Sequence, residues 1–149
     1  MISIEPALEA DRPAIEGLLT GSGLPLDGLE LALASAVVAR ADDSVVGCAA
    51  VEPYGPFGLL RSVCVAAELR GTGLGHQLVK AAEELAASRG IAELYLLTET
   101  AERWFPRLGY LPTTRAAVPA ALTDSPEFVS ACPESAAVLH KRLPLRHAR

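Results

Sequence analysis

Apolar residues recur along the chain at two spacings, one typical of helices and one typical of strands. The clearest helical spacing follows Gly73, where leucines and alanines return every three or four positions as far as residue 86. Gly90 stands where a helix of this kind is usually closed by a glycine, so we predict a helix that starts near Gly73 and ends before Gly90. Three shorter helices are predicted, one after Pro13, one at residues 26–34 and one at residues 100–107.

Short apolar runs between these helices predict β-strands. They fall at residues 2–4, 36–40, 45–52, 57–66, 92–98 and 136–143, with one more from Tyr110 onward. A hairpin turn is predicted at residues 42–44, and the break at residues 53–56 makes the runs on either side of it antiparallel neighbours. Because the helix near Gly73 crosses between two strands, the predicted fold class is mixed α/β, or α+β.

Composition and charge narrow the function classes. The chain has 149 residues, of which 50% are hydrophobic and 21% charged, so we expect one folded domain over residues 1–149 with a core of its own. Lysine and arginine number 13 against 18 acidic residues, a formal net charge of −5. Because a polyphosphate backbone is held by a basic face, this balance disfavours a nucleic-acid partner. The basic residues of the 141–149 tail are interpreted as a solvated terminus.

The cysteines and the N-terminus indicate the compartment. Cys48, Cys64 and Cys132 are odd in number and far apart, a pattern that fits neither a disulfide framework nor a metal site. The first two are interpreted as core thiols, whereas Cys132 lies in a polar stretch with a better case for exposure. The acidic N-terminus is unlike a signal peptide, and no apolar run approaches the ~20 residues of a membrane span. We therefore expect a cytoplasmic protein with reduced thiols and no membrane partner.

A glycine-rich loop is the most informative motif. It reads Arg70-Gly71-Thr72-Gly73-Leu74-Gly75-His76 and joins the strand ending near Val65 to the predicted helix. A helix start leaves backbone N–H groups unpaired and carries partial positive charge, so it favours an anionic phosphate, to which Arg70 adds a guanidinium. The spelling matches neither a dinucleotide fingerprint nor a P-loop. His76 is placed either beside the phosphate or on the solvent face of the helix.

The pattern R-x-x-G-x-G and its surroundings resemble the GNAT acetyltransferase superfamily. The resemblance rests on Val63-Cys64-Val65 before the loop, the loop itself, Tyr95-Leu96-Leu97-Thr98, and the run from Trp104 to Tyr110. It implies a mixed, mostly antiparallel sheet with helices on both faces, whose fourth and fifth strands splay apart around acetyl-CoA. It also implies that the pantetheine arm pairs with the backbone of Val63, Cys64 and Val65. The pyrophosphate is then held by the amides of Gly71, Thr72, Gly73, Leu74, Gly75 and His76.

Two ionisable groups found in many superfamily members are missing at the matching positions. Leu59 stands where a glutamate base is expected, and Phe105 stands where a tyrosine acid is expected. The base is therefore left to a water relay or to another residue. Glu99, Glu52 and Tyr54 are candidates because each falls near a strand end, and the alternative for all three is an ordinary exposed side chain.

Thr98 ends the predicted fifth strand and is the other catalytic candidate, together with Glu99. Its hydroxyl is placed either to donate to the leaving thiolate or to satisfy the backbone of the strand end. The thioester oxygen needs no side chain, since a backbone N–H near Val63 or Val65 can serve.

Two subgroups of the superfamily are similar to this chain. The run from Tyr95 to Thr100 resembles the acetyltransferase domain of N-acetylglutamate synthases, which acetylate the amine of an amino acid. The fuller string, with Leu60-Arg61-Ser62-Val63 and residues 128–136, is closer to arsenic-resistance N-acetyltransferases. Arg61 shares strand parity with Val63 and Val65, so it is a candidate for clamping a carboxylate or another oxyanion in the cleft, the alternative being a surface ion pair.

The predicted function is acetyl-CoA-dependent N-acetylation of a small amino-acid-like amine, with a link to arsenic resistance and no metal. The alternatives are an acetyl-CoA-binding sensor without turnover, which the missing groups at Leu59 and Phe105 favour, and an amino-acid acetyltransferase like the N-acetylglutamate synthases. Because superfamily members are often dimers, a homodimer is an expectation as well.

Overall fold

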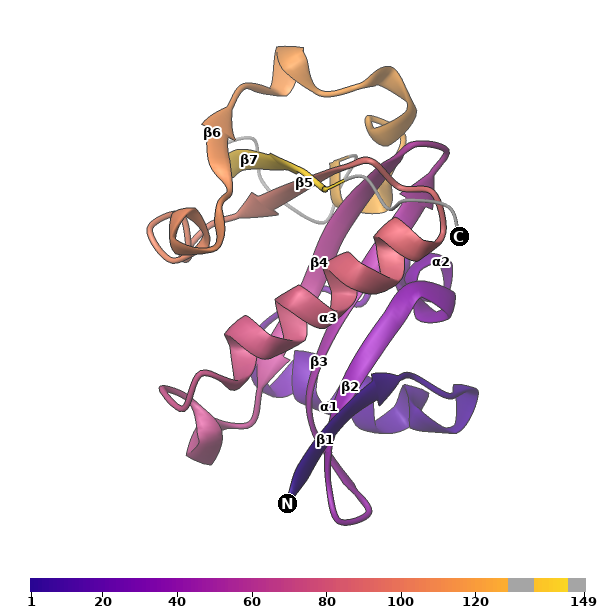
Figure 1. The fold of residues 1–149 in the computed structure, drawn as a ribbon, viewed down its shortest axis with the longest axis vertical. Helices are drawn as coiled ribbons and strands as arrows, with labels where there is room; N and C mark the ends of the chain where they lie inside the picture. Colours follow the sequence, from indigo (N-terminus) through magenta and orange to yellow (C-terminus); the bar gives the residue numbers. More distant parts are fainter. Residues whose placement is uncertain (129–135, 145–149) are drawn as a thin grey trace.

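A mixed sheet forms the centre of the molecule. The computed structural model describes residues 1–128 and 136–144. Within these residues the strands make one seven-stranded sheet in the order β1-β2-β3-β4-β5-β7-β6 (Figure 1). The strands are β1 (Ile2–Pro6), β2 (Ala36–Ala41), β3 (Ser44–Tyr54), β4 (Phe57–Val65), β5 (Glu93–Thr98), β6 (Leu111–Thr113) and β7 (Ala137–Arg142).

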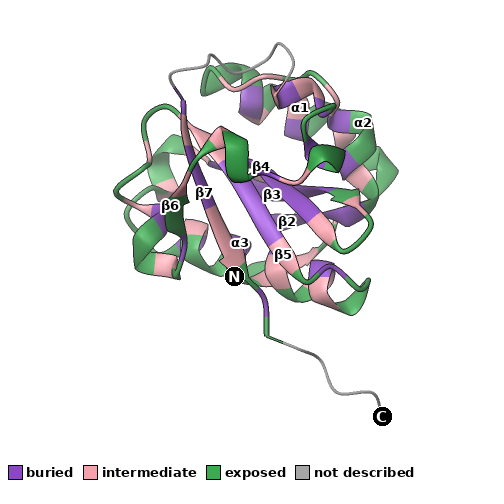
Figure 2. Ribbon diagram, turned by 90° about the horizontal axis from the view of Figure 1, so that it is seen from above, coloured by how far each residue is buried: buried purple, intermediate pink, exposed green. Residues whose placement is uncertain are grey.

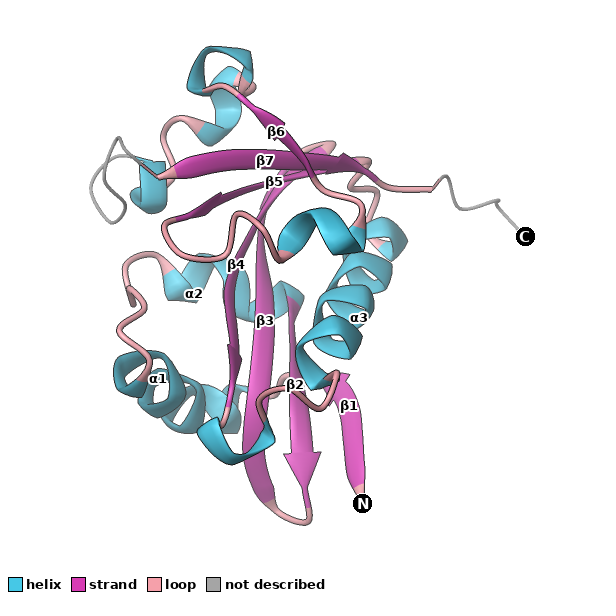
Figure 3. Cartoon of the chain, turned by 90° about the vertical axis from the view of Figure 1, so that its left-hand side faces the viewer, coloured by secondary structure: helices cyan, strands magenta, loops and turns pink. Residues whose placement is uncertain are grey.

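Helices cover both faces of this sheet. The α-helices are α1 (Arg12–Gly21), α2 (Leu29–Ala32) and α3 (Leu74–Ser88), and 3-10 turns occupy Glu9–Asp11, Leu33–Ser35, Ala67–Leu69, Phe105–Leu108, Arg115–Ala117 and Ala120–Leu122. Figure 3 shows α1 and α2 on one side of the strands and α3 on the other. The apolar spacing of α3 brings Leu78 and Ala82 into the core on its side, and Ile15 and Leu19 of α1 pack on the opposite side.

The sheet divides at the junction of β4 and β5. These two strands run parallel and pair only at Phe57 with Glu93, Gly58 with Leu94, and Leu59 with Tyr95. The other neighbours in the sheet pair antiparallel. Beyond Leu59 the two strands part, as Figure 1 shows, so the splayed, mostly antiparallel sheet implied by the resemblance is confirmed.

Burial is concentrated around this divided sheet. Figure 2 shows the buried residues along the central strands and on the inner sides of the helices. Gly58 lies at the β4–β5 junction, where an added Cβ would lie 2.7 Å from Val51 Cγ1 and 2.9 Å from Leu94 Cδ2. The junction is therefore closely packed, and only glycine fits there.

A β-bulge in β4 changes which side chains share a face. Ser62 has a φ of 58°, and the register with β3 shifts between Cys48 and Ala50. Val63 and Val65 pack toward the α3 side, whereas Cys64 packs with α1. Arg61 also lies on the α1 side, because it bonds to the chain between α1 and α2. The expectation that Arg61 shares the face of Val63 and Val65 is therefore wrong.

Three local predictions differ from the structure. The helix expected at residues 100–107 is only a 3-10 turn, Phe105–Leu108, since Pro106 has no N–H for an α-helical bond. The break expected at Pro53 is absent, because Pro53 pairs with Gly58 beyond the end of β2 and so needs no donor on that side. The helix expected at residues 26–34 is shortened to α2 and a 3-10 turn after Gly28, whose φ is 75°.

Candidate active site

A cleft of about 620 Å³ opens where β4 and β5 part. One wall is β4 from Leu60 to Val65, and the other is the end of β5 with the turn that follows it. On its β5 side, β4 has no strand partner after Leu59, so the backbone edge of this segment faces the cleft without a neighbouring strand. A cleft of this size and lining suits an extended small molecule with amide groups.

The glycine loop closes one end of the cleft. Gly71 and Gly73 have φ values of 80° and 87°, which only glycine adopts without strain. Gly73 begins α3 with no side chain capping the helix, and both glycines border the cleft. The start of α3 therefore offers free amides and a positive dipole end to an anion.

Arg70 adds a positive charge to the same end. Its Nε donates to Val65 O at 3.2 Å, and its Nη2 donates to Ser22 Oγ at 3.2 Å. Both partners are neutral, and Arg70 borders the cleft. The guanidinium is thus held across the end of β4 while its charge stays available to an anionic ligand.

Trp104 packs against the glycine loop. A Cβ added at Gly75 would lie 3.3 Å from Trp104 Cζ2, and both residues border the cleft. Trp104 also meets Phe105 edge-on, with ring centroids 4.8 Å apart. This contact fixes the distance between α3 and the turn after β5, so it sets the width of the cleft at that end.

The two catalytic candidates from the sequence lie on the β5 wall. Thr98 and Glu99 both border the cleft, and the Glu99 side chain is exposed. Thr98 Oγ1 accepts a hydrogen bond from Ala101 N at 3.0 Å. The hydroxyl therefore satisfies the backbone, and its own proton remains free to be donated.

The remaining cofactor candidates differ in what they can offer. Val63, Val65 and His76 border the cleft. Cys64 and Leu74 are buried, with Cys64 Sγ 3.1 Å from Ser22 Oγ, so only their backbones are available. Thr72 Oγ1 donates to Leu69 O at 2.6 Å, which leaves the side chain committed within the loop.

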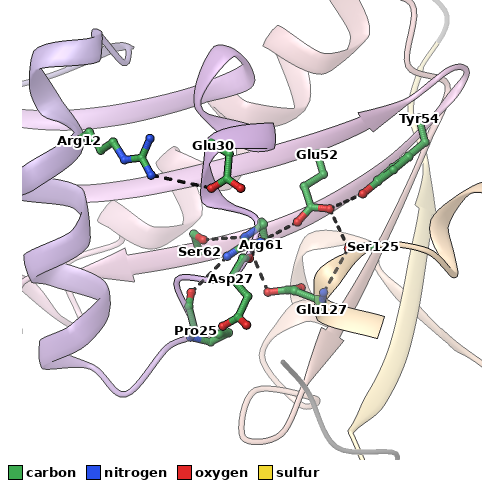
Figure 4. A network of polar contacts seen from close by, with 10 residues as sticks. All are labelled: Arg12, Pro25, Asp27, Glu30, Glu52, Tyr54, Arg61, Ser62, Ser125 and Glu127. Atoms are coloured by element: carbon green, nitrogen blue, oxygen red, sulfur yellow. Dashed lines mark hydrogen bonds and ion pairs between the residues drawn. The ribbon is translucent and has the colours of Figure 1, made fainter. Parts of the chain in front are cut away.

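A buried polar cluster lies beside the β4 wall (Figure 4). The Arg61 side chain has no exposed surface, and its Nη1 donates to Glu52 Oε2 at 2.6 Å and to Asp27 O. Its Nη2 donates to Pro25 O at 3.2 Å, and its Nε donates to Ser62 Oγ at 3.1 Å. All three guanidinium nitrogens are thus engaged within the protein. The surface ion pair expected for Arg61 is wrong, because the side chain is fully buried, whereas the oxyanion clamp stays a prediction: Arg61 borders the cleft, but each of its nitrogens already donates within the protein.

Glu52 forms the centre of the cluster. Tyr54 OH donates to Glu52 Oε1 at 2.5 Å, and Ser125 Oγ donates to the same oxygen at 2.7 Å. Burial, together with the bond to Glu52, raises the pKa of Tyr54 to about 12. Glu52 is fully buried and both of its oxygens accept hydrogen bonds, so its carboxylate and the Tyr54 phenol are structural partners rather than free bases.

Glu127 is a functional candidate that sequence reasoning missed. It is 5% exposed and borders the cleft, and its Oε1 lies 3.8 Å from Arg61 Nε. Within the part of the chain that the structure describes, Oε2 is buried and has no hydrogen-bond partner. Burial raises the pKa of Glu127 to about 7; Arg61 opposes this rise, while Glu52 and Asp27 add to it. No periodic pattern at residues 114–128 signals that this carboxylate returns to the sheet.

The described residues contain two free cysteines and no metal-binding group. Cys48 and Cys64 are buried thiols, as expected, and burial raises the pKa of Cys48 to about 12. Cys132 lies outside the described residues. In residues 1–128 and 136–144 no group of three or more His, Cys, Asp or Glu side chains is placed to hold a metal ion. Over the same residues, the structure contains no helix with the length and apolar character to span a membrane.

Comparison with known proteins identifies the family. A family model described as an acetyltransferase (GNAT) domain matches residues 33–112. An amino-acid acetyltransferase of Ralstonia nicotianae is 36% identical over 88 residues, which cover 58% of this chain and 20% of the relative. A Pseudomonas aeruginosa amino-acid acetyltransferase is 33% identical over 79 residues, covering 52% of this chain and 18% of the relative. The chain thus spans about a fifth of the length of these curated relatives.

Solved structures share the fold. N-acetylglutamate synthase from Neisseria gonorrhoeae, complexed with coenzyme A and N-acetyl-glutamate, has a TM-score of 0.82 at 22% identity, over 97% of this chain and 35% of the synthase. Rv2747 from Mycobacterium tuberculosis, in complex with CoA and NLQ, has a TM-score of 0.78 at 24% identity, over 95% and 99% of the two chains. These relatives agree with the resemblance to N-acetylglutamate synthases, whereas the arsenic-resistance grouping stays a prediction.

Proposed function

The chain belongs to the acetyltransferase (GNAT) domain family, and on this premise we propose that it transfers an acetyl group from acetyl-CoA to the amine of a small, amino-acid-like acceptor. The observation that carries the proposal is the cleft between β4 and β5, which has a cationic glycine loop at one end and the buried acidic cluster along its β4 wall. The cleft thus offers positive charge to the anionic acyl donor at one end and negative charge to the cationic amine along the β4 wall.

The residues present fit acetyl-CoA. The amides at the start of α3, with Arg70, suit the pyrophosphate, and the edge of β4 at Val63, which has no strand partner on the β5 side, suits the amides of the pantetheine arm. A side chain at Gly75 would make a tight contact with Trp104, and Gly71 and Gly73 carry no side chain that would keep a phosphate away from the loop backbone. When bound, acetyl-CoA supplies the acetyl thioester.

The protein's own residues then assist the transfer. A backbone N–H of the β4 wall near Val63 is suited to the thioester oxygen, and the Thr98 hydroxyl is suited to donate its proton to the leaving thiolate. Phe105 is a buried apolar residue that borders the cleft, so it adds an apolar surface there and no ionisable group.

The acceptor is best described as an amino acid or a close analogue. The curated relatives are amino-acid acetyltransferases, which supports this class. An arsenic-containing amino-acid analogue is the finer form of the proposal and rests on the sequence resemblance alone. Recognition of an oxyanion by Arg61 is not part of it, because the three nitrogens of that side chain already have partners.

A sensor that binds acetyl-CoA without turnover is the second candidate. The apolar residues at positions 59 and 105 favour it, because the usual ionisable groups are missing there. Glu127 weighs against a sensor, because it places a carboxylate that could serve as a base on the cleft.

Release of CoA thiol distinguishes the two candidates. Wild-type protein would be incubated with acetyl-CoA and single amines: glutamate, neutral amino acids, polyamines, and phosphorus- or arsenic-bearing amino acids. Calorimetry would measure acetyl-CoA binding separately. We expect thiol release with at least one amino-acid-like amine. Binding without release for the whole panel would favour the sensor, and absence of binding would overturn both.

A further inference from the structure

Glu127 is a buried carboxylate that borders the cleft, and an amine has to lose a proton before it can accept an acetyl group. We propose that the Glu127 carboxylate receives the ammonium group of the acceptor and removes its proton, with Arg61 and Glu52 as positioning residues. This inference rests on the proposed function and names a general base in place of the one that is missing at position 59.

One carboxylate oxygen of Glu127 is buried and has no hydrogen-bond donor within the described residues. Glu127 Oε2 has no donor in residues 1–128 and 136–144 and is shielded from water. Such an atom is costly to keep unless a ligand satisfies it. Because Glu127 borders the cleft, a rotation of its carboxyl group brings Oε2 to an ammonium group there, whose three N–H donors and positive charge supply both the missing hydrogen bond and the missing countercharge.

The charge balance of the cluster is the second argument. Arg61 is the cation nearest Glu127, but its shorter ion pair is to Glu52, at 2.6 Å against 3.8 Å (Figure 4). Glu52 therefore neutralises Arg61, so among these three buried side chains the ionised Glu127 leaves one excess negative charge beside the cleft, and Asp27 adds to it. This charge selects a cationic acceptor and disfavours an anionic group at the same place.

Charged and titratable groups face Glu127 from three sides. Arg61 approaches from β4, and Glu52 with Tyr54 lies on β3. Asp27 lies in the segment before α2, and its carbonyl accepts from Arg61. These are the charged and titratable groups that face Glu127, and two of them are carboxyl groups. Arg61 is the cation among them, and its Nε lies 3.8 Å from Glu127 Oε1.

Glu127 takes the first of the two protons that the acceptor nitrogen loses. The ammonium nitrogen passes one proton to the Glu127 carboxylate, which becomes neutral, and the free amine attacks the thioester carbon. The C–N bond forms and the C–S bond breaks. A second proton from the nitrogen ends on the CoA sulfur, and Glu127 returns its proton to water. A carboxyl with a pKa of about 7 is suited to this role, because it accepts a proton near neutral pH and releases it again.

Glu127→Gln tests the assignment. We expect the variant to bind acetyl-CoA normally and to lose about 10²–10⁴-fold in kcat/KM. The wild-type kcat/KM should rise about tenfold per pH unit up to an inflection near 7, an inflection that Glu127→Gln should lack. The same acceptor is used for both proteins, so its own ionisation is common to both profiles. Glu127→Asp should keep the inflection at reduced kcat.

Glu102→Gln is the matched control. Glu102 is exposed, lies in the turn after β5, and does not border the cleft, so the same charge change there should leave the pH profile unaltered. An active wild type whose Glu127→Gln variant keeps its rate and its pH profile would overturn this inference and leave the proposed function standing. A wild type that binds acetyl-CoA but acetylates no amine would overturn both.

Discussion

The Glu52 carboxylate and the Arg61 guanidinium lie 2.6 Å apart on neighbouring strands, with both side chains fully excluded from solvent. A buried pair of this kind gains little over apolar residues of the same shape, but losing one partner leaves an uncompensated charge. Because Glu52 also accepts from Tyr54 and Ser125, the pair links β3, β4 and the segment that carries Glu127.

Arg61→Met should lower the free energy of unfolding by about 3–5 kcal/mol, because it leaves two buried carboxylates without a cation. The double variant Glu52→Gln/Arg61→Met should recover part of this loss, as measured by urea unfolding. Arg12→Met is the control: its ion pair with Glu16 is exposed, so the change should stay within about 0.5 kcal/mol. If Arg61→Met kept full stability and lost activity only toward anionic acceptors, Arg61 would instead bind the acceptor.

Glu127→Gln should stabilise the protein at alkaline pH while it removes activity. The folded-state pKa of Glu127 is about 7 against an ordinary value of 4.5, so the folded chain holds this proton more tightly than the unfolded chain. The contribution of Glu127 to stability is therefore fully present below pH 4.5 and is lost as the pH rises to about 7, a difference of roughly 3 kcal/mol. Glutamine has no charge to bury.

The melting temperatures of wild type and Glu127→Gln should accordingly diverge between pH 5 and pH 8, with the variant higher at pH 8. Glu102→Gln should show no such divergence. A constant gap between the wild type and Glu127→Gln across this range would mean that Glu127 titrates normally in the folded protein.

Gly73→Ala should weaken acetyl-CoA binding beyond its cost in stability. Gly73 and Gly90 flank α3, both have a φ of 87°, and an added Cβ would meet nothing within 4 Å at either position. Alanine at each should therefore cost about 1–2 kcal/mol of unfolding free energy through backbone strain. Only Gly73 borders the cleft, so calorimetry should find weaker acetyl-CoA binding in Gly73→Ala than in Gly90→Ala. Equal affinities would argue against an anion site at the start of α3.

Trp104 should report acetyl-CoA binding by its fluorescence. It is the only tryptophan in the chain, and it packs on Gly75 at the edge of the cleft. A ligand that enters beside the glycine loop changes the polarity around the indole, so titration should give a saturable change in emission that CoA reverses by competition. Calorimetric binding without any change in emission would place the ligand away from the Trp104 end.

The position of α3 and of the glycine loop could be predicted from local sequence patterns. The spacing of Leu78 and Ala82 predicts α3, Gly90 predicts its end, and the glycine loop predicts the anion site at its start. The bulge at Ser62 could not be predicted in this way, because serine has no preference for a positive φ and tertiary packing imposes it. That single residue reverses the face on which Arg61 lies.

Glu127 was beyond prediction for a different reason. Its environment comes from Arg61, Glu52 and Asp27, which lie 66 to 100 residues earlier in the chain. Only the return of residues 114–128 to the sheet brings these groups together, and no periodicity marks that return. Leu59 indicates that a base is missing from its usual place, but not where another one lies.

Gly58 lies at the junction from which β4 and β5 diverge to form the cleft. The two arms of the sheet are joined by three residue pairs around it, and Val51 and Leu94 leave no room for a side chain there. A methyl group at Gly58 would push β4 and β5 apart, and the separation of the two strands would increase with distance from the junction. The span between the glycine loop and Glu127 is thus governed by a residue that touches neither substrate.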